Sequence, residues 1–236
     1  MTLEELRAYL DQLILSLEGS DRDILKARLS GLVSCFPFNE YEFIIMFLRD
    51  KGLITFADYD KLRANYVLAN KYLNLFEVAP RIFGQIWGEQ HVRDLDKRFE
   101  KAGKSLDPQY HGEYDLWIHG IKVEAKASRA YDKRIRGGLA SKALHYDSGK
   151  PFWMNFQQLK PDMCDILIFI GVWTDQIVYW VLTSDEAKTS RYISHQHRGG
   201  VEYQIGITDR NIGEFDAYKV NQSQLGDKVI QKAREK

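Results

Sequence analysis

The sequence contains few of the features that identify membrane-spanning, disulfide-linked or zinc-ribbon proteins. No apolar run approaches the roughly 20 residues that a membrane-spanning helix requires. The two cysteines, Cys35 and Cys164, form no C-x-x-C pair, so neither a zinc ribbon nor a disulfide framework is available. The N-terminal segment is amphipathic and acidic throughout, unlike a signal peptide. We therefore expect a soluble, cytoplasmic protein with free thiols and no membrane partner.

The chain also lacks an excess of charge of either sign. Its 236 residues include 33 basic and 33 acidic ones, so the formal net charge is zero. A protein that coats DNA without selectivity would be strongly basic, so this class is disfavoured, although local basic patches remain. No G-x-x-x-x-G-K-[ST] segment is present, which argues against an ATP-driven enzyme and against a nucleotide cofactor.

The first third of the chain has the periodicity of amphipathic helices, and Pro80 marks the expected end of a helical subdomain over residues 1–80. The expected caps and ends of its four helices are Gly19-Ser20, Asp21 or Asp23, Asn39, Gly52 and Thr55. The subdomain could be a packing or dimerisation layer. A winged-helix-like DNA reader is the alternative, and the sequence leaves both open.

Beyond residue 80 the pattern changes to alternating helices and strands. We expect a long helix over 81–103, a hairpin of strands 114–118 and 121–127, a helix around 152–159, two strands either side of Thr174-Asp175, an edge strand within 191–211, and a C-terminal helix over 223–236. Buried strands between helices predict an α/β (α+β) domain over 81–236, with a mixed central β-sheet flanked by helices.

The hairpin sequence EYDLWIHGIKVEAKAS, residues 113–128, carries an unusual arrangement of charges. Side chains alternate along a strand, so Glu124 and Lys126 share one face, whereas Val123 and Ala125 share the other. The hairpin can place Asp115 opposite Glu124. Two converging carboxylates repel each other unless a cation or a shared proton is present. Carboxylate oxygens suit Mg²⁺ or Mn²⁺, so the stretch predicts a metal site.

The lysine extends this prediction from binding to chemistry. Lys126 beside such an ion could hold and polarise an attacking water, which is what hydrolysis of a phosphodiester needs. The alternative is an exposed strand face that these charges keep soluble. The apolar sequence around Glu124, the hairpin, and a further acid, Glu89, on the preceding helix favour the catalytic interpretation.

The motif YD…VEAK resembles the core of the PD-(D/E)XK nuclease superfamily, whose members share a helix, a hairpin bearing D…(D/E)xK, another helix and further strands. The resemblance covers roughly residues 81–184, and Tyr114 stands where the family name has proline. It implies these roles: Asp115 and Glu124 as metal-binding acids, Lys126 as the catalytic lysine, the Ala125 carbonyl as a further metal ligand, Glu89 as a loosely matched helix acid, and Gln157 or Gln158 as a glutamine on the next helix.

Within this superfamily, a near-neutral, mid-sized chain with a helical extension and no ATPase motif resembles a type II restriction endonuclease. The resemblance implies a homodimer that cuts double-stranded DNA with Mg²⁺, or Mn²⁺, as cofactor. A structure-specific repair or junction nuclease is one alternative, and a non-catalytic DNA-binding regulator is another.

Two segments outside the motif are candidates for DNA contact. The loop after Lys126 is basic, and its arginines and lysines could contact phosphates or guanine edges, with a mobile, solvated loop as the alternative. The candidates in this loop are Arg129, Lys133, Arg134, Arg136 and Lys142. The second segment contains His195, His197 and Arg198. A zinc site at the two histidines lacks a third and fourth ligand, so DNA contact is the favoured interpretation.

Overall fold

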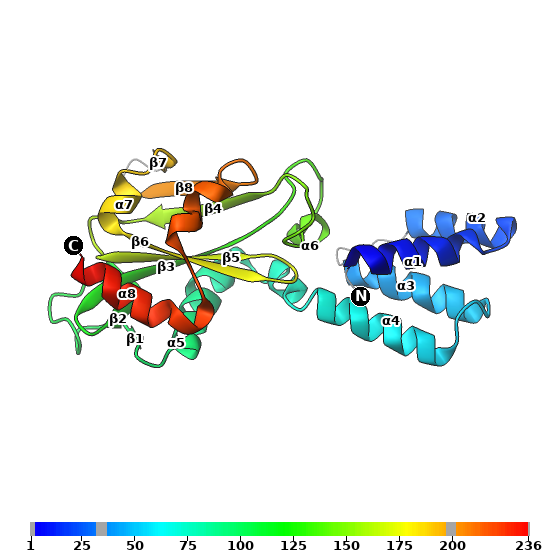
Figure 1. Ribbon diagram of the computed structural model, residues 1–236, viewed down its shortest axis with the longest axis horizontal. Coiled ribbons are helices and arrows are strands. Elements are labelled where there is room, and N and C mark those ends of the chain that lie inside the picture. Colours follow the sequence, from blue (N-terminus) through cyan, green and yellow to red (C-terminus); the bar gives the residue numbers. More distant parts are fainter. Residues whose placement is uncertain (1–2, 32–36, 197–201, 236) are drawn as a thin grey trace.

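The computed structural model describes residues 3–31, 37–196 and 202–235. Four helices form the N-terminal part: α1 (Leu3–Leu15), α2 (Gly19–Ser30), α3 (Pro37–Asp50) and α4 (Phe56–Ala69). They pack around their own apolar cluster, which includes Leu6, Ile45 and Leu48, and they lie at one end of the molecule (Figure 1). None of the helices in the described parts of the chain is both long and apolar enough to cross a membrane.

The ends of these helices partly match the expected ones. The Thr55 hydroxyl accepts a hydrogen bond from the Asp58 amide at 3.1 Å, which confirms it as the cap of α4, and Gly52, just after α3, has a φ of 72°. The other caps were wrong. Helix α2 begins at Gly19 without a side-chain cap, and α3 begins at Pro37, so Asn39 lies inside it. Proline suits the first turn of a helix because it lacks an amide hydrogen.

The remaining residues form two sheets and several short helices. The helical elements are η1 (Leu73–Phe76), η2 (Ile82–Gly88), α5 (Glu89–Leu95), α6 (Leu139–Lys142), α7 (Ser184–Lys188), η3 (Ile212–Tyr218), η4 (Gln222–Gln224) and α8 (Leu225–Arg234). The strands are β1 (Glu100–Lys101), β2 (Leu116–Ile118), β3 (Ile121–Arg129), β4 (Trp153–Leu159), β5 (Ile166–Val172), β6 (Ile177–Thr183), β7 (Ile193–His195), β8 (Tyr203–Thr208) and β9 (Lys219–Val220).

The larger sheet has the order β1-β2-β3-β5-β6-β9, and the smaller one has the order β4-β8-β7. Strands β3 and β5 are parallel and the other neighbours are antiparallel, so the larger sheet is mixed. Helices flank it, as expected from the sequence. Its hairpin turns through His119 and Gly120, with φ values of 49° and 87°. Positive φ at both central residues is characteristic of the type I′ hairpin turn.

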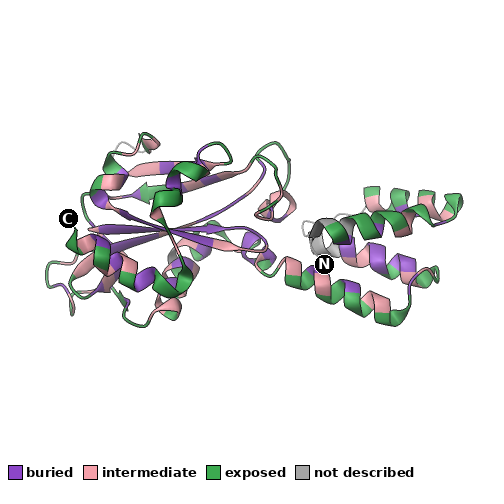
Figure 2. Ribbon diagram, viewed as in Figure 1, coloured by how far each residue is buried: buried purple, intermediate pink, exposed green. Residues whose placement is uncertain are grey.

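The two faces of the large sheet have separate apolar cores. One face, with Val123, Ile168 and Val181, packs against α5 and α8. The other, with Phe169 and Trp180, packs against Met154, Phe156 and other residues of the small sheet. The small sheet therefore lies on the side of the large sheet opposite α5 and α8 (Figure 1), and buried residues concentrate along the strands between them (Figure 2).

Two expected helices differ in the structure. The segment around 152–159 is strand β4, which pairs with β8 from Trp153–Thr208 to Leu159–Tyr203. A short apolar segment does not reveal by its own periodicity whether a distant strand will pair with it. The expected helix over 81–103 ends at Leu95, and its first part, η2, is a π-helix. The strands on either side of Thr174-Asp175 are confirmed as β5 and β6, and the 191–211 segment contains β7 and β8.

Candidate active site

The hairpin brings three of the predicted side chains together. Leu116 pairs with Val123, so the chain places Asp115 across from Glu124, one residue before β2 begins. The Lys126 Nζ lies 2.9 Å from Glu124 Oε1 and 3.4 Å from Asp115 Oδ2. The lysine therefore bridges both carboxylates. Ala125 points to the opposite face and belongs to the apolar core under α5.

Glu124 is the most buried member of this group, with only 2% of its surface exposed. Its Oε2 accepts a hydrogen bond from the Lys160 amide at 3.0 Å, and the Cys164 Sγ lies 3.8 Å from the same oxygen. Burial raises the pKa of Glu124, and the Lys126 charge opposes that rise. Sequence analysis missed Lys160 and Cys164 as partners. They follow Glu124 by 36 and 40 residues, and no spacing signal connects them to it.

Lys126 remains an ammonium in this environment. Burial acts to lower its pKa, but Glu124 and Asp115 outweigh that effect, and the pKa is raised. The group is therefore a hydrogen-bond donor and a positive charge, available to a water or to a phosphate oxygen.

Asp115 is oriented by the main chain of β3. Its Oδ2 accepts a hydrogen bond from the Ala125 amide at 3.0 Å. The amide and the carbonyl of one strand residue face the same neighbouring strand. The Ala125 carbonyl is thus directed to the Asp115 side of β3.

Glu89 approaches the group from the first turn of α5. Gly88 precedes it, and a Cβ atom there would lie 3.3 Å from the Ala127 Cβ, so this glycine lets the helix pack closely on β3. Burial, together with the negative charge of Asp115, raises the pKa of Glu89 to about 7, with Lys126 opposing the rise. Glu89 therefore lies close enough to Asp115 and Lys126 to feel their charges, as predicted, although no hydrogen bond or ion pair joins it to Asp115 or Glu124.

These residues lie in a cleft of about 920 Å³ between β3, η2 and the end of β4 that carries Gln157 and Gln158. Asp115, Glu124 and Lys126 all line it, as does Glu89. On the β4 side the wall includes Gln157 and Gln158. The expectation that a glutamine here would lie on a helix was wrong, because both residues are on a strand.

The donor set suits a hard divalent cation. Mg²⁺ is held by one or two carboxylates and keeps several of its waters, which matches Asp115 and Glu124 with the nearby Ala125 carbonyl. The Lys126 ammonium compensates part of the negative charge of the two carboxylates, and a bound cation would compensate the rest. Within the described ranges, no cluster of three or more histidine, cysteine or acidic side chains has the spacing of a metal site. A cation here would depend on two carboxylates and water.

Arg129, one of the expected DNA contacts, is largely buried and is not part of an exposed loop. Arg129 is only 6% exposed, and its Nη1 donates to the Leu75 and Val78 carbonyls at 2.8 and 2.7 Å. Its guanidinium also lies over the Phe83 ring, 4.3 Å from the centroid. Arg129 therefore anchors the segment after α4 to β3 through its Nη1.

Most of the other basic candidates are exposed, whereas Lys142, on α6, is half-buried. Lys133 lies over the Trp153 ring, Arg134 forms a two-point ion pair with Asp132, and Arg136 is on the surface. His195 is exposed on β7, with its ring 4.6 Å from that of Tyr203. His197 and Arg198 lie outside the described residues.

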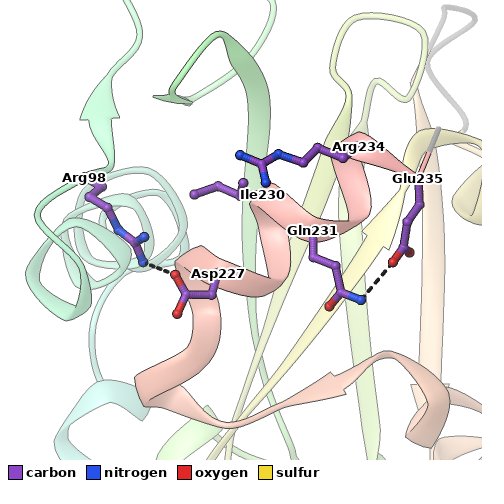
Figure 3. A pocket seen from close by; sticks show the side chains of 6 residues that line it. All are labelled: Arg98, Asp227, Ile230, Gln231, Arg234 and Glu235. Carbon is purple, nitrogen blue, oxygen red and sulfur yellow. Dashed lines mark hydrogen bonds and ion pairs between the residues drawn. The ribbon is translucent and has the colours of Figure 1, made fainter.

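A second, smaller hollow lies against α8 and has a volume of about 460 Å³ (Figure 3). Its charged groups are mostly paired. Arg98 donates to Asp227 at 2.7 Å and to Asp96, and Gln231 donates to Glu235 at 2.8 Å. Both of its carboxylates, Asp227 and Glu235, are exposed, unlike the buried Glu124 of the cleft.

Comparison of the chain with protein-family models, with curated proteins and with solved structures gave no significant match.

Proposed function

We propose that this protein is a metal-dependent deoxyribonuclease with a restriction-endonuclease-like core, which cuts double-stranded DNA at specific sequences in the manner of a type II restriction enzyme. The observation that carries the proposal is the convergence of Asp115, Glu124 and Lys126 in one cleft. Their order and spacing are those of the D…(D/E)xK motif.

The division of roles follows from the environment of each group. The Lys160 amide and burial hold Glu124 in one orientation, and the Ala125 amide holds Asp115. Bound Mg²⁺ or Mn²⁺ would supply a water of lowered pKa and positive charge for the phosphate. Lys126, as an ammonium, donates hydrogen bonds to the attacking water or to a phosphate oxygen and stabilises negative charge in the transition state.

The experiment is incubation of the purified protein with long duplex DNA and Mg²⁺, with EDTA as a control. We expect discrete bands, which require cutting at defined sequences. Asp115→Asn and Glu124→Gln should each reduce cleavage by more than about 100-fold, as expected for groups that act in the transition state. Asp209→Asn, an exposed acid outside the cleft, is the matched control and should cut normally. Circular dichroism checks that each variant folds.

The outcomes separate this proposal from its rivals. Cleavage confined to branched or flapped DNA would indicate a repair or junction nuclease. Full activity in Asp115→Asn or Glu124→Gln would contradict the site assignment. DNA binding without hydrolysis under any divalent cation would favour a non-catalytic regulator, in which Lys126 and its two carboxylates only stabilise the hairpin. A homodimer with one site for each DNA strand stays a prediction, tested by sedimentation of the protein with its DNA.

A further inference from the structure

We propose that the outer face of β4 and β8 reads base edges in the major groove of the duplex, with Gln157 and Gln158 as specificity-determining residues for adenine. This inference rests on the proposed nuclease function, because it identifies how the same cleft would select its DNA.

The first observation is a β-bulge that turns two glutamines outward. Met154 and Phe156 are buried against the large sheet, so regular alternation would bury residue 158 as well. The pairing of β4 with β8 instead shifts between Phe156 and Leu159, and Leu159 takes the buried position. Gln157 and Gln158 are both exposed and both line the cleft. Bulges of this kind commonly re-aim side chains next to active sites.

The bulge also imposes strain on one of these residues. Gln158 has a φ of 56°, in the left-handed region that residues other than glycine seldom occupy. Such a conformation is unfavourable and is found mainly where the surrounding structure requires it. Its amide donates to the Gln196 Oε1 at 2.9 Å, which holds the bulge to the segment after β7. Within the described part of the chain, neither glutamine's side-chain amide has a hydrogen-bond partner.

The second observation is that the bulge continues a row of amides on the outer face of the small sheet. Trp153, Asn155 and Gln157 alternate with the buried residues of β4 and so point outward. Asn155 donates to the Gln204 side chain of β8 at 3.0 Å. A single bond between two carboxamides leaves further donors and acceptors on both, so the pair can still bond to a ligand.

The row has a positive charge at the end farther from Gln157. The Lys133 Nζ lies 3.0 Å from the centroid of the Trp153 ring, which itself covers Gly206 of β8. From Trp153 to Gln157 the strand extends about 13 Å, which corresponds to roughly four base-pair steps. Among the described elements, no helix makes more than marginal contact with β4 or β8. The face is thus open, polar and continuous with the cleft.

The chemistry of this face matches DNA bases more closely than it matches phosphate. The major groove admits a two-stranded β-ribbon, and the side-chain amide of glutamine or asparagine can bond adenine N6 and N7 at once. A phosphate-binding face would be rich in arginine and lysine, whereas this row has one lysine and several amides. A duplex whose backbone reaches Asp115 and Glu124 would meet Gln157 and Gln158 in the same cleft.

The test selects duplexes of random sequence with the Asp115→Asn protein, which retains the reading face. The bound DNA is sequenced at fixed salt. We expect an enriched motif that contains adenine. Adding Gln157→Ala or Gln158→Gly should reduce discrimination at an adenine position by roughly 5- to 150-fold, the effect of losing one two-point contact. Glycine at 158 accepts the positive φ, so that variant removes the side chain without adding strain.

Two further variants separate reading from folding. Gln157→Glu loses its donor and keeps an acceptor, so the preferred base should change from adenine to cytosine, whose N4 amino group donates. Gln222→Ala, an exposed glutamine on η4 outside the cleft, is the matched control and should select the wild-type motif. Affinity for unselected DNA should stay within about twofold in every variant, because base contacts contribute little to it.

The outcomes distinguish this inference from the proposed function. A motif that is unchanged in Gln157→Ala and Gln158→Gly, or that lacks adenine, overturns the reading face while cleavage by the unmodified protein still supports a nuclease. Cleavage without any enriched motif overturns it in the same way. Failure of the unmodified protein to bind or cut any DNA overturns the proposed function first, and the inference with it.

Discussion

Replacing Lys126 by methionine tests the charge balance of the site without any measurement of activity. Methionine keeps the apolar length of the side chain and removes the ammonium. Glu124, at 2% exposed, is then left with a buried negative charge, opposite Asp115. Breaking a buried ion pair in this way typically costs 3–5 kcal/mol. Because 23% of the Lys126 side chain is exposed, we expect the free energy of unfolding to fall by about 3 kcal/mol, which is the low end of that range.

For a chain of this length the loss corresponds to a fall in Tm of roughly 6–12 °C, measured in EDTA by differential scanning calorimetry. Lys122→Met is the matched control on the same strand. It removes a more exposed pair with Asp107, whose lysine is 39% exposed, and should cost less than about 1 kcal/mol.

Divalent cations should then reverse the effect. In Lys126→Met the two carboxylates are uncompensated, and Mg²⁺ or Mn²⁺ at about 100 times its Kd would restore roughly 2.7 kcal/mol. The double variant Glu124→Gln, Lys126→Met should show neither a large fall in Tm in EDTA nor a rise in Tm when the cation is added. If the cations leave the Tm of Lys126→Met unchanged, Asp115 and Glu124 do not form a cation site and the reasoning is refuted.

Three other substitutions give separate predictions. Folding raises the pKa of Glu89 from 4.5 to about 7, so its charge destabilises the fold above pH 7, and this penalty fades as the pH falls toward 4.5. Glu89→Gln should therefore raise the free energy of unfolding in EDTA by up to roughly 3 kcal/mol at pH 8 and by little below pH 5. Urea titrations at the two pH values measure the difference. Gly171→Ala would place a Cβ 2.6 Å from the buried Trp180 ring, so it should lower the free energy of unfolding by about 1–3 kcal/mol in urea denaturation. Gly213→Ala, whose Cβ would have nothing within 4 Å, is the control and should be nearly neutral. Equal losses of stability in the two variants would contradict the packing. Thr55→Ala should lose about 1 kcal/mol of stability through its cap, whereas Thr55→Ser should not, and a thermal melt that did not separate the two would disprove that role.

The parts of the fold that sequence predicts correctly depend on local signals. The His119-Gly120 turn and the apolar alternation around it specify the hairpin, and this register alone brings Asp115 to Glu124. Strands β5 and β6 are recognisable because both are continuous apolar runs of strand length, separated by a short turn.

The errors concern elements whose structure is decided by distant partners. Strand β4 resembles a short helix in sequence, and only its pairing with β8, about 50 residues later, makes it a strand. A separation of 36 residues likewise hides the Lys160 amide that holds Glu124. Arg129 was mistaken for a surface residue because its loop is basic, whereas the fold directs it into the carbonyls of Leu75 and Val78.

Under the proposed function, the bulge in β4 would limit how the DNA specificity of the protein can change. Gln158 lies two residues before Lys160, whose amide orients the buried acid Glu124. An insertion or deletion between residues 156 and 160 would shift that amide, so a change of length would disturb Glu124 together with the two glutamines. Substitution of Gln157 or Gln158 leaves the chain path intact. Under the proposed function, new target sequences would be reached by single substitutions at these two positions rather than by changes in the length of β4.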